Sequence, residues 1–62
     1  MMDGIILVYS SAVNAGVISV SDGNRYQFTK ADWLPAVPPS NDMLVTFRPS
    51  DRKALEINMQ AA

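Results

Sequence analysis

The acidic side chains are the groups in this chain with the clearest potential for chemistry, because two paired carboxylates can act as general acid and general base. There are six of them, spread along the sequence: Asp3, Asp22, Asp32, Asp42, Asp51 and Glu56. Most stand where turns and strand ends are expected, and there a carboxylate commonly binds backbone amides. No pair is flanked by residues that would position a substrate, so we expect no enzymatic activity.

Cysteine and histidine are both absent from the sequence. Their absence removes the usual ligands of zinc, haem and iron–sulfur clusters, and it excludes Cys/His and Ser/His nucleophilic catalysis. We therefore predict no metal site and no cofactor. Disulfides are excluded as well, which is compatible with a reducing compartment, and we expect a cytoplasmic protein.

The chain has 62 residues, which is close to the lower size limit for a core without disulfides or a metal. We assign residues 1–59 to one domain and residues 60–62 to a frayed tail. The longest apolar run, residues 5–9, is far shorter than the roughly 20 residues of a membrane helix and lacks the flanks of a signal peptide. The net charge of −1 does not indicate a generally basic surface for nucleic acid.

Five segments have the composition and alternation of β-strands, and these elements must position any site. They are residues 3–9, 15–20, 25–29, 42–48 and 53–59. The first is apolar on both faces, so we expect it to be covered on both sides or to lie against a partner. The last two carry apolar residues at alternate positions that are predicted to face the core: Met43, Val45 and Phe47, and Leu55, Ile57 and Met59.

The connections between these strands carry distinct turn signals. Asp22-Gly23-Asn24 predicts a tight hairpin between the second and third strands, because glycine and asparagine tolerate positive φ. Residues 34–42 contain three prolines, which exclude a central strand and favour an extended loop. Residues 30–33, just before it, can form one helical turn, and residues 49–51 are the expected turn between the last two strands.

Five short strands with a long connection between the third and fourth predict an all-β fold. The best match is a small five-stranded antiparallel Greek-key barrel of the OB type. Closing one sheet on itself removes exposed strand edges, and so short a chain cannot supply two full sheets with helices. A partly open barrel and an SH3-like barrel are the alternatives.

Several short motifs resemble the cold-shock domain, the compact OB-fold of bacterial nucleic-acid chaperones. They are Gly4-Ile5, Gly16-Val17-Ile18, Asp22-Gly23, Val45-Thr46-Phe47 and Ala54. The pattern G-V-I, then D-G-x-R-Y-x-F and D-W, is also similar to degenerate cold-shock-like domains fused ahead of bacterial membrane segments. The resemblance covers nearly the whole chain and implies the same barrel.

The residues that stack on bases in that family are replaced in this chain. The family's second strand carries K-G-F-G-F-[IV], and the matching stretch here, residues 13–18, has Val13 at the lysine position. Ala15 and Val17 stand at its two stacking positions, and Val8 stands at the position of a first-strand tryptophan. Because each stacked base contributes about 1–3 kcal/mol, the loss of three platforms predicts very weak nucleic-acid binding.

The replacements themselves suggest a different kind of surface. In the family's register, Val8, Ala15 and Val17 form a small aliphatic patch on the outer face of the barrel, joined by Ile6. We predict that this patch and Gln27 form a protein interface, used for a partner protein or for a second copy of the chain. The alternative is that these side chains are ordinary core beneath the proline-rich loop.

The second predicted function is weak binding of single-stranded DNA or RNA, with these candidate contacts: Arg25, Tyr26, Phe28, Lys30 and Trp33. The simplest register of residues 25–29 buries the two aromatic side chains and exposes positions 25, 27 and 29, whereas a slip of one residue inverts this. Trp33 is expected to be a partly buried core anchor. A third possibility is an enzyme accessory or inhibitor with no ligand of its own.

Overall fold

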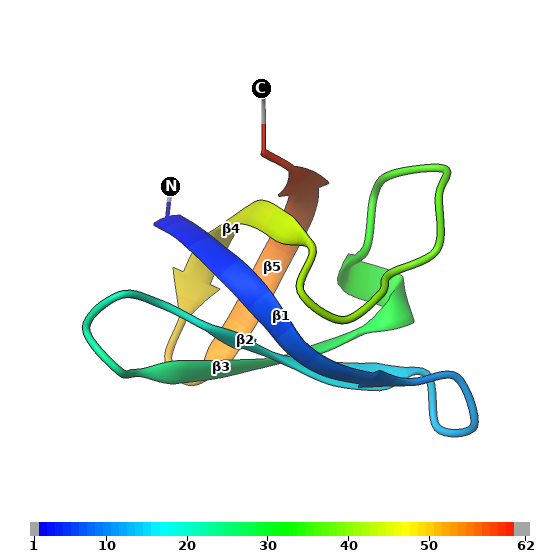
Figure 1. The fold of residues 1–62 in the computed structure, drawn as a ribbon, viewed down its shortest axis with the longest axis horizontal. Helices are drawn as coiled ribbons and strands as arrows, with labels where there is room; N and C mark the ends of the chain where they lie inside the picture. The colour runs from blue at the N-terminus through cyan, green and yellow to red at the C-terminus, as the bar shows by residue number, and fades with distance from the viewer. Residues whose placement is uncertain (1, 61–62) are drawn as a thin grey trace.

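Residues 2–60, which the computed structural model describes, form five strands that close into one barrel (Figure 1). The strands are β1 (Met2–Ser10), β2 (Ala15–Ser19), β3 (Arg25–Thr29), β4 (Leu44–Ser50) and β5 (Lys53–Met59). A single 3-10 turn, η1 (Lys30–Asp32), follows β3. The predicted all-β fold is confirmed, and the closed barrel is consistent with a small OB-fold-like architecture.

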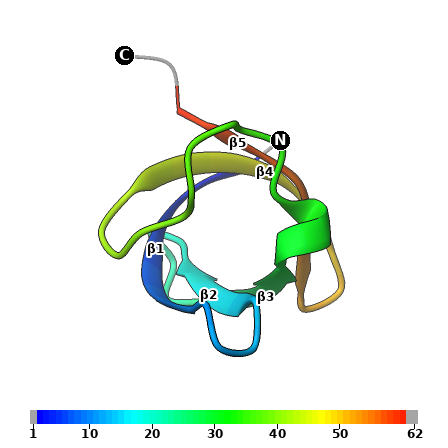
Figure 2. The same ribbon diagram turned by 90° about the vertical axis from the view of Figure 1, so that its right-hand side faces the viewer.

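The order of the strands around the barrel is β1-β2-β3-β5-β4, with β4 returning to pair with β1 (Figure 2). Four of the neighbouring pairs are antiparallel, but β3 and β5 run parallel through the pair Gln27 and Lys53. The predicted antiparallel barrel is therefore wrong at this seam. The reason is parity, because a closed ring of five strands cannot alternate direction at every neighbour.

The core is built from side chains of all five strands. Its fully buried members are Ile6, Ile18, Val45, Phe47, Ala54 and Ile57, with Phe28 only 2% exposed beside them. Partly buried side chains pack around this cluster, among them Tyr9, Tyr26 and Trp33. The ring centroids of Tyr9 and Trp33 lie 5.8 Å and 6.2 Å, respectively, from the ring centroid of Phe28. The predicted register of β3 is confirmed, since Phe28 is buried and residues 25, 27 and 29 are exposed, while Tyr26 faces inward but is only half-buried.

A bulge in β1 overturns one prediction about that strand, the outward position of Ile6, and leaves the other prediction with its second alternative, contact with a partner. Between Ile6 and Val8 the pairing with β2 advances two residues on β1 but only one on β2, from Ile18 to Val17, so Leu7 is an extra residue. The alternation changes phase there, which buries Ile6 completely and removes it from the predicted outer patch. Leu7 and Val8 are then both exposed, so β1 is not covered on both sides within this chain.

A second bulge corrects the predicted core face of β5. Three residue steps on β5, from Leu55 to Asn58, lie opposite two steps on β4, and Glu56 has a φ of 52°. The phase change buries Ile57 together with Ala54. Leu55 is only partly buried and Met59 is exposed, although both were predicted to share the core face with Ile57.

The ends of β4 also differ from the prediction. The strand begins at Leu44 rather than residue 42, since Asp42 has a φ of 67°, outside the extended region. It continues through Pro49 and Ser50, which pair with β5, so the turn is shifted to residues 51 and 52. In the predicted tail, the Gln60 backbone N–H donates to the Leu44 carbonyl at 3.2 Å, and residues 61 and 62 lie outside the described residues.

The proline-rich loop, residues 34–42, leads from η1 beside β5 to the β1 side of the barrel before entering β4 (Figure 2). The Trp33 indole N–H donates to the Val37 carbonyl at 2.6 Å, and the Asp42 N–H donates to the Ile6 carbonyl at 2.7 Å. The predicted loop and the predicted helical turn before it are confirmed. No helix among residues 2–60 is long and apolar enough to cross a membrane.

Candidate functional site

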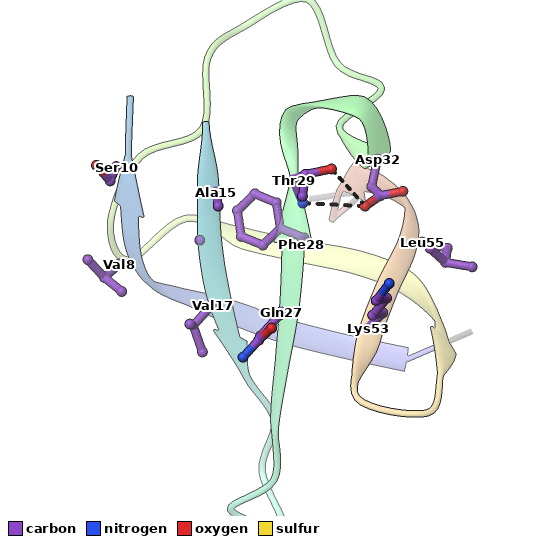
Figure 3. A pocket seen from close by; sticks show the side chains of 11 residues that line it. Val8, Ser10, Ala15, Val17, Gln27, Phe28, Thr29, Asp32, Lys53 and Leu55 are labelled. Carbon is purple, nitrogen blue, oxygen red and sulfur yellow. Dashed lines mark hydrogen bonds between the residues drawn. The ribbon is translucent and has the colours of Figure 1, made fainter. Parts of the chain in front are cut away.

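A groove of about 430 Å³ lies on the outer face of the barrel, where β1, β2, β3 and β5 come together (Figure 3). Eleven residues line it. All four residues of the predicted protein interface are among them: Val8, Ala15, Val17 and Gln27. The tertiary structure thus brings the predicted patch together, and the proline-rich loop contributes no residue to the lining.

One side of the groove is an aliphatic wall made by Val8, Ala15 and Val17. Val17 points outward because its neighbours on β2, Gly16 and Ile18, are buried, as alternation along a regular strand requires. Val8 pairs with Val17 across the two strands and is 50% exposed. The bulge at Leu7 is what turns Val8 to this face, and it completes the wall.

The floor of the groove is the backbone of Gly16 lying against the ring of Phe28. A Cβ on Gly16 would lie 2.6 Å from the Val8 carbonyl oxygen and 2.7 Å from two ring atoms of Phe28, so only glycine fits. The backbone can approach the ring this closely only because glycine has no side chain. Phe28 lines the groove from below while remaining almost fully buried, so it is a floor and not an exposed stacking surface.

The opposite side of the groove is mostly polar and charged, with Leu55 of β5 as its one aliphatic residue. Gln27 and Thr29 come from β3, Asp32 from η1 and Lys53 from the start of β5. The Asp32 carboxylate accepts hydrogen bonds from the Thr29 N–H and hydroxyl through Oδ2, both at 3.3 Å. Lys53 is placed by the parallel seam, where the Gln27 N–H donates to the Arg52 carbonyl at 2.8 Å. Asp32 and Lys53 are the two charged residues in the lining, and they have opposite signs.

The residues predicted to contact nucleic acid are not gathered into one surface. Phe28 is buried, and Tyr26 packs inward with its ring 5.1 Å from the ring of Phe47. Trp33 packs against the core with its indole N–H held by the proline-rich loop. The two exposed cations of the set, Arg25 and Lys30, stand at opposite ends of β3.

Six further groove residues were not among the predicted site residues: Ser10, Gly16, Thr29, Asp32, Lys53 and Leu55. Leu55 had been assigned to the core, because nothing local marks Glu56 as the site of a bulge. Asp32 and Lys53 lie 21 positions apart in the sequence, and they line the same groove only because β3 pairs with β5. No sequence pattern linked them.

Among residues 2–60, no three acidic, histidine or cysteine side chains gather closely enough to hold a metal ion. The described part of the chain contains one ion pair, between Arg48 and Glu56 at 3.2 Å, and both of its side chains are more than half exposed. That pair lies outside the groove lining.

Comparison with known proteins adds no family: no protein-family model matches the chain, and no curated protein matches its sequence. The resemblance to cold-shock domains therefore remains a prediction from the residues.

Proposed function

We propose that this chain is a small, non-catalytic binding module that contacts proteins through the groove between β1, β2, β3 and β5. The aliphatic wall carries the proposal, because Val8, Ala15 and Val17 stand together on the outside of a barrel whose core is already complete without them. A protein interface commonly combines an apolar centre with a polar rim. The groove has both, with Asp32 and Lys53 on the side opposite the wall.

The size of the groove is compatible with capture of a partner's side chains. Its volume of about 430 Å³ falls within the range of roughly 300–1,000 Å³ that is common for ligand sites. Burying apolar surface contributes about 25 cal/mol per Å², and half-exposed Val8 still has surface to bury. The floor of the groove is closely packed, because there is no room for a Cβ on Gly16 beside the buried ring of Phe28.

Weak binding of single-stranded nucleic acid is the second candidate, and the resemblance to cold-shock domains is what motivates it. Its main obstacle is the inward packing of Tyr26, Phe28 and Trp33, since stacking contributes about 1–3 kcal/mol per base. Binding through Arg25 and Lys30 alone would be electrostatic and would weaken steeply with salt.

Selection of peptides from a displayed random library tests the protein-binding proposal. The targets are the unmodified protein, Val17→Asp, and Val13→Asp as the matched control. Val13 is 70% exposed and lies outside the groove lining, so its substitution adds the same charge elsewhere on the surface. We expect the unmodified protein and the control to enrich the same apolar peptides, and Val17→Asp to lose at least about tenfold in affinity for them. Equal binding by all three proteins would contradict the proposal.

A labelled mixed-sequence oligonucleotide, titrated at low salt and followed by fluorescence anisotropy, separates the two candidates. We expect no saturation at protein concentrations up to about 100 μM, because no stacking surface is exposed. Salt-sensitive binding in the low micromolar range would favour the nucleic-acid function and count against the protein-binding one.

A further inference from the structure

We infer that the occupant of this groove is the same groove of a second copy of the chain, in a two-fold dimer that brings Asp32 of each copy to Lys53 of the other. The inference rests on the proposed function, since it names the partner for the same surface. It follows from how apolar and charged groups are distributed around the groove.

The groove has two unlike sides and two unlike ends. Figure 3 shows the aliphatic residues of β1 and β2 on one side, and Asp32 and Lys53 both on the other. Along that charged side, Asp32 lies at the η1 end and Lys53 lies farther along, beside Gln27. The charged side therefore carries a negative group toward one end and a positive group toward the other.

A two-fold axis converts this distribution into complementarity. In an isologous dimer, residue i of one copy contacts residue j of the other, and j contacts i in return. An axis in the contact plane that runs across the strands leaves the two sides in place and exchanges the two ends. With this axis, the aliphatic walls of the two copies face each other. Asp32 of each copy faces Lys53 of the other, so the dimer has two such contacts. An axis along the strands would instead press each aliphatic wall against the charged side of the other copy, which is unfavourable.

The two charged groups are available for such contacts. Both hydrogen bonds from Thr29 reach the same oxygen of Asp32, Oδ2, and they hold the carboxylate in place while Oδ1 can still accept. Lys53 is exposed. Within residues 2–60 the one ion pair is Arg48 with Glu56, so neither Asp32 nor Lys53 is neutralised inside its own copy.

The size of the surface sets the expected strength of the dimer. Eleven residues line the groove, whereas stable interfaces use about 20–30 residues on each side. We therefore expect a reversible dimer with a dissociation constant between roughly 10 μM and 1 mM. Exposed ion pairs are screened by salt, so raising the salt from about 0.05 to 0.5 M should weaken the dimer several-fold.

Sedimentation velocity over a concentration series, with charge-reversal variants, tests the inference. Lys53→Asp alone, or Asp32→Lys alone, places like charges at both symmetric contacts and should raise the dissociation constant about tenfold. The double variant Asp32→Lys/Lys53→Asp recreates both pairs in reverse and should return to within about threefold of the unmodified protein. Arg25→Asp is the matched control, because it makes the same charge change at an exposed residue outside the groove and should leave the dimer unchanged.

Substitution of Asp32 also removes the acceptor for Thr29, so thermal melts of each variant must show a folded protein at the temperature of the experiment. Asp32→Asn keeps a side-chain acceptor, loses only the charge, and should weaken the dimer less than Asp32→Lys does. Amide NMR spectra give an independent readout. Signals of residues 15–17, 27–29 and 53–55 should shift with protein concentration, and those of Gly23 and Asn24 in the distant hairpin turn should not.

Two outcomes overturn the dimer. One is a monomer at about 2 mM protein at either salt concentration, which is above the expected range of dissociation constants. The other is a dimer that neither charge reversal nor Val17→Asp weakens, which would place the contact on another face. If the groove still selects peptides while the protein is monomeric, the dimer fails and the proposed function stands. If the groove selects no peptides and the protein is monomeric, both the dimer and the proposed function fail.

Discussion

Side chains alternate between the two faces of the sheet in the β2–β3 hairpin and in β1 and β5, but bulges interrupt the alternation in β1 and β5 only. In the hairpin, five residue pairs from Ala15–Thr29 to Ser19–Arg25 follow one another without a shift, so strict alternation decides which side chains face inward. In β1 and β5, one extra residue interrupts the alternation and reverses its phase. Sequence patterns therefore predict the faces of the hairpin correctly and misassign a residue beside each bulge, Ile6 in β1 and Leu55 in β5.

The groove depends on both kinds of strand. The regular hairpin supplies its floor, through Gly16 and Phe28, and part of each side, through Val17 and Gln27. The bulges supply its flanks, because one turns Val8 outward and the other takes Leu55 out of the core face. A barrel with regular β1 and β5 would place these two side chains differently, and the groove would lose an edge on each side.

The largest expected effect lies in the regular hairpin. Phe28→Ala removes a ring that is 2% exposed and contacts Tyr9 and Trp33, so it should reduce the free energy of unfolding by about 3–5 kcal/mol. For so small a domain this is most of the stability, and urea titration followed by circular dichroism should show a largely unfolded variant. Gln27→Ala, one residue earlier and on the outer face, should change the stability by less than about 0.5 kcal/mol. A larger loss for Gln27→Ala than for Phe28→Ala would mean that β3 is in the opposite register.

The next effect concerns the bulge in β1. Ile6→Ala should cost about 2–5 kcal/mol because Ile6 is fully buried, whereas Leu7→Ala should cost less than about 1 kcal/mol because Leu7 is 41% exposed. Thermal or urea unfolding of the pair measures the difference. Equal losses, or a larger loss at Leu7, would show that the phase change between residues 6 and 8 is wrong.

Gly16→Ala tests the floor of the groove and should cost about 1–3 kcal/mol. The added methyl group collides with the Val8 carbonyl oxygen and with the Phe28 ring, and neither can move freely within the barrel. Urea titration measures the loss. The collision with the ring predicts that Phe28→Leu costs less in the Gly16→Ala background than by itself, because the smaller side chain makes room. Strict additivity of the two substitutions would argue against a direct contact.

The smallest effect isolates the bulge in β5. Glu56→Gly and Glu56→Ala both remove the carboxylate that pairs with Arg48, so that loss cancels in the comparison. Only glycine adopts a φ near 52° without strain, and the glycine variant should therefore be the more stable by about 1 kcal/mol. The difference in unfolding midpoint at equal m-value measures it. An alanine variant as stable as the glycine variant would mean that residue 56 is not held in the left-handed region.

Local chemistry in the sequence determined the five strands, the hairpin and the proline-rich loop. Asp22-Gly23-Asn24 favours a turn, alternating side chains favour extended backbone, and prolines cannot donate a backbone hydrogen bond to a neighbouring strand. The resemblance to cold-shock domains placed Val8, Ala15 and Val17 on one outer surface, and the tertiary structure brings them together with Gln27. The local alternation of residues 25–29 predicted the inward packing of Phe28 and Tyr26.

The tertiary structure alone decided the two bulges, the parallel seam and the far side of the groove. A bulge exists only relative to the pairing of a neighbouring strand, and no residue type near Leu7 or Glu56 announces it. The parallel seam follows from closing an odd number of strands, a property of the whole ring rather than of any segment. Asp32 and Lys53 meet at one groove for that reason, since only ring closure places β5 beside β3.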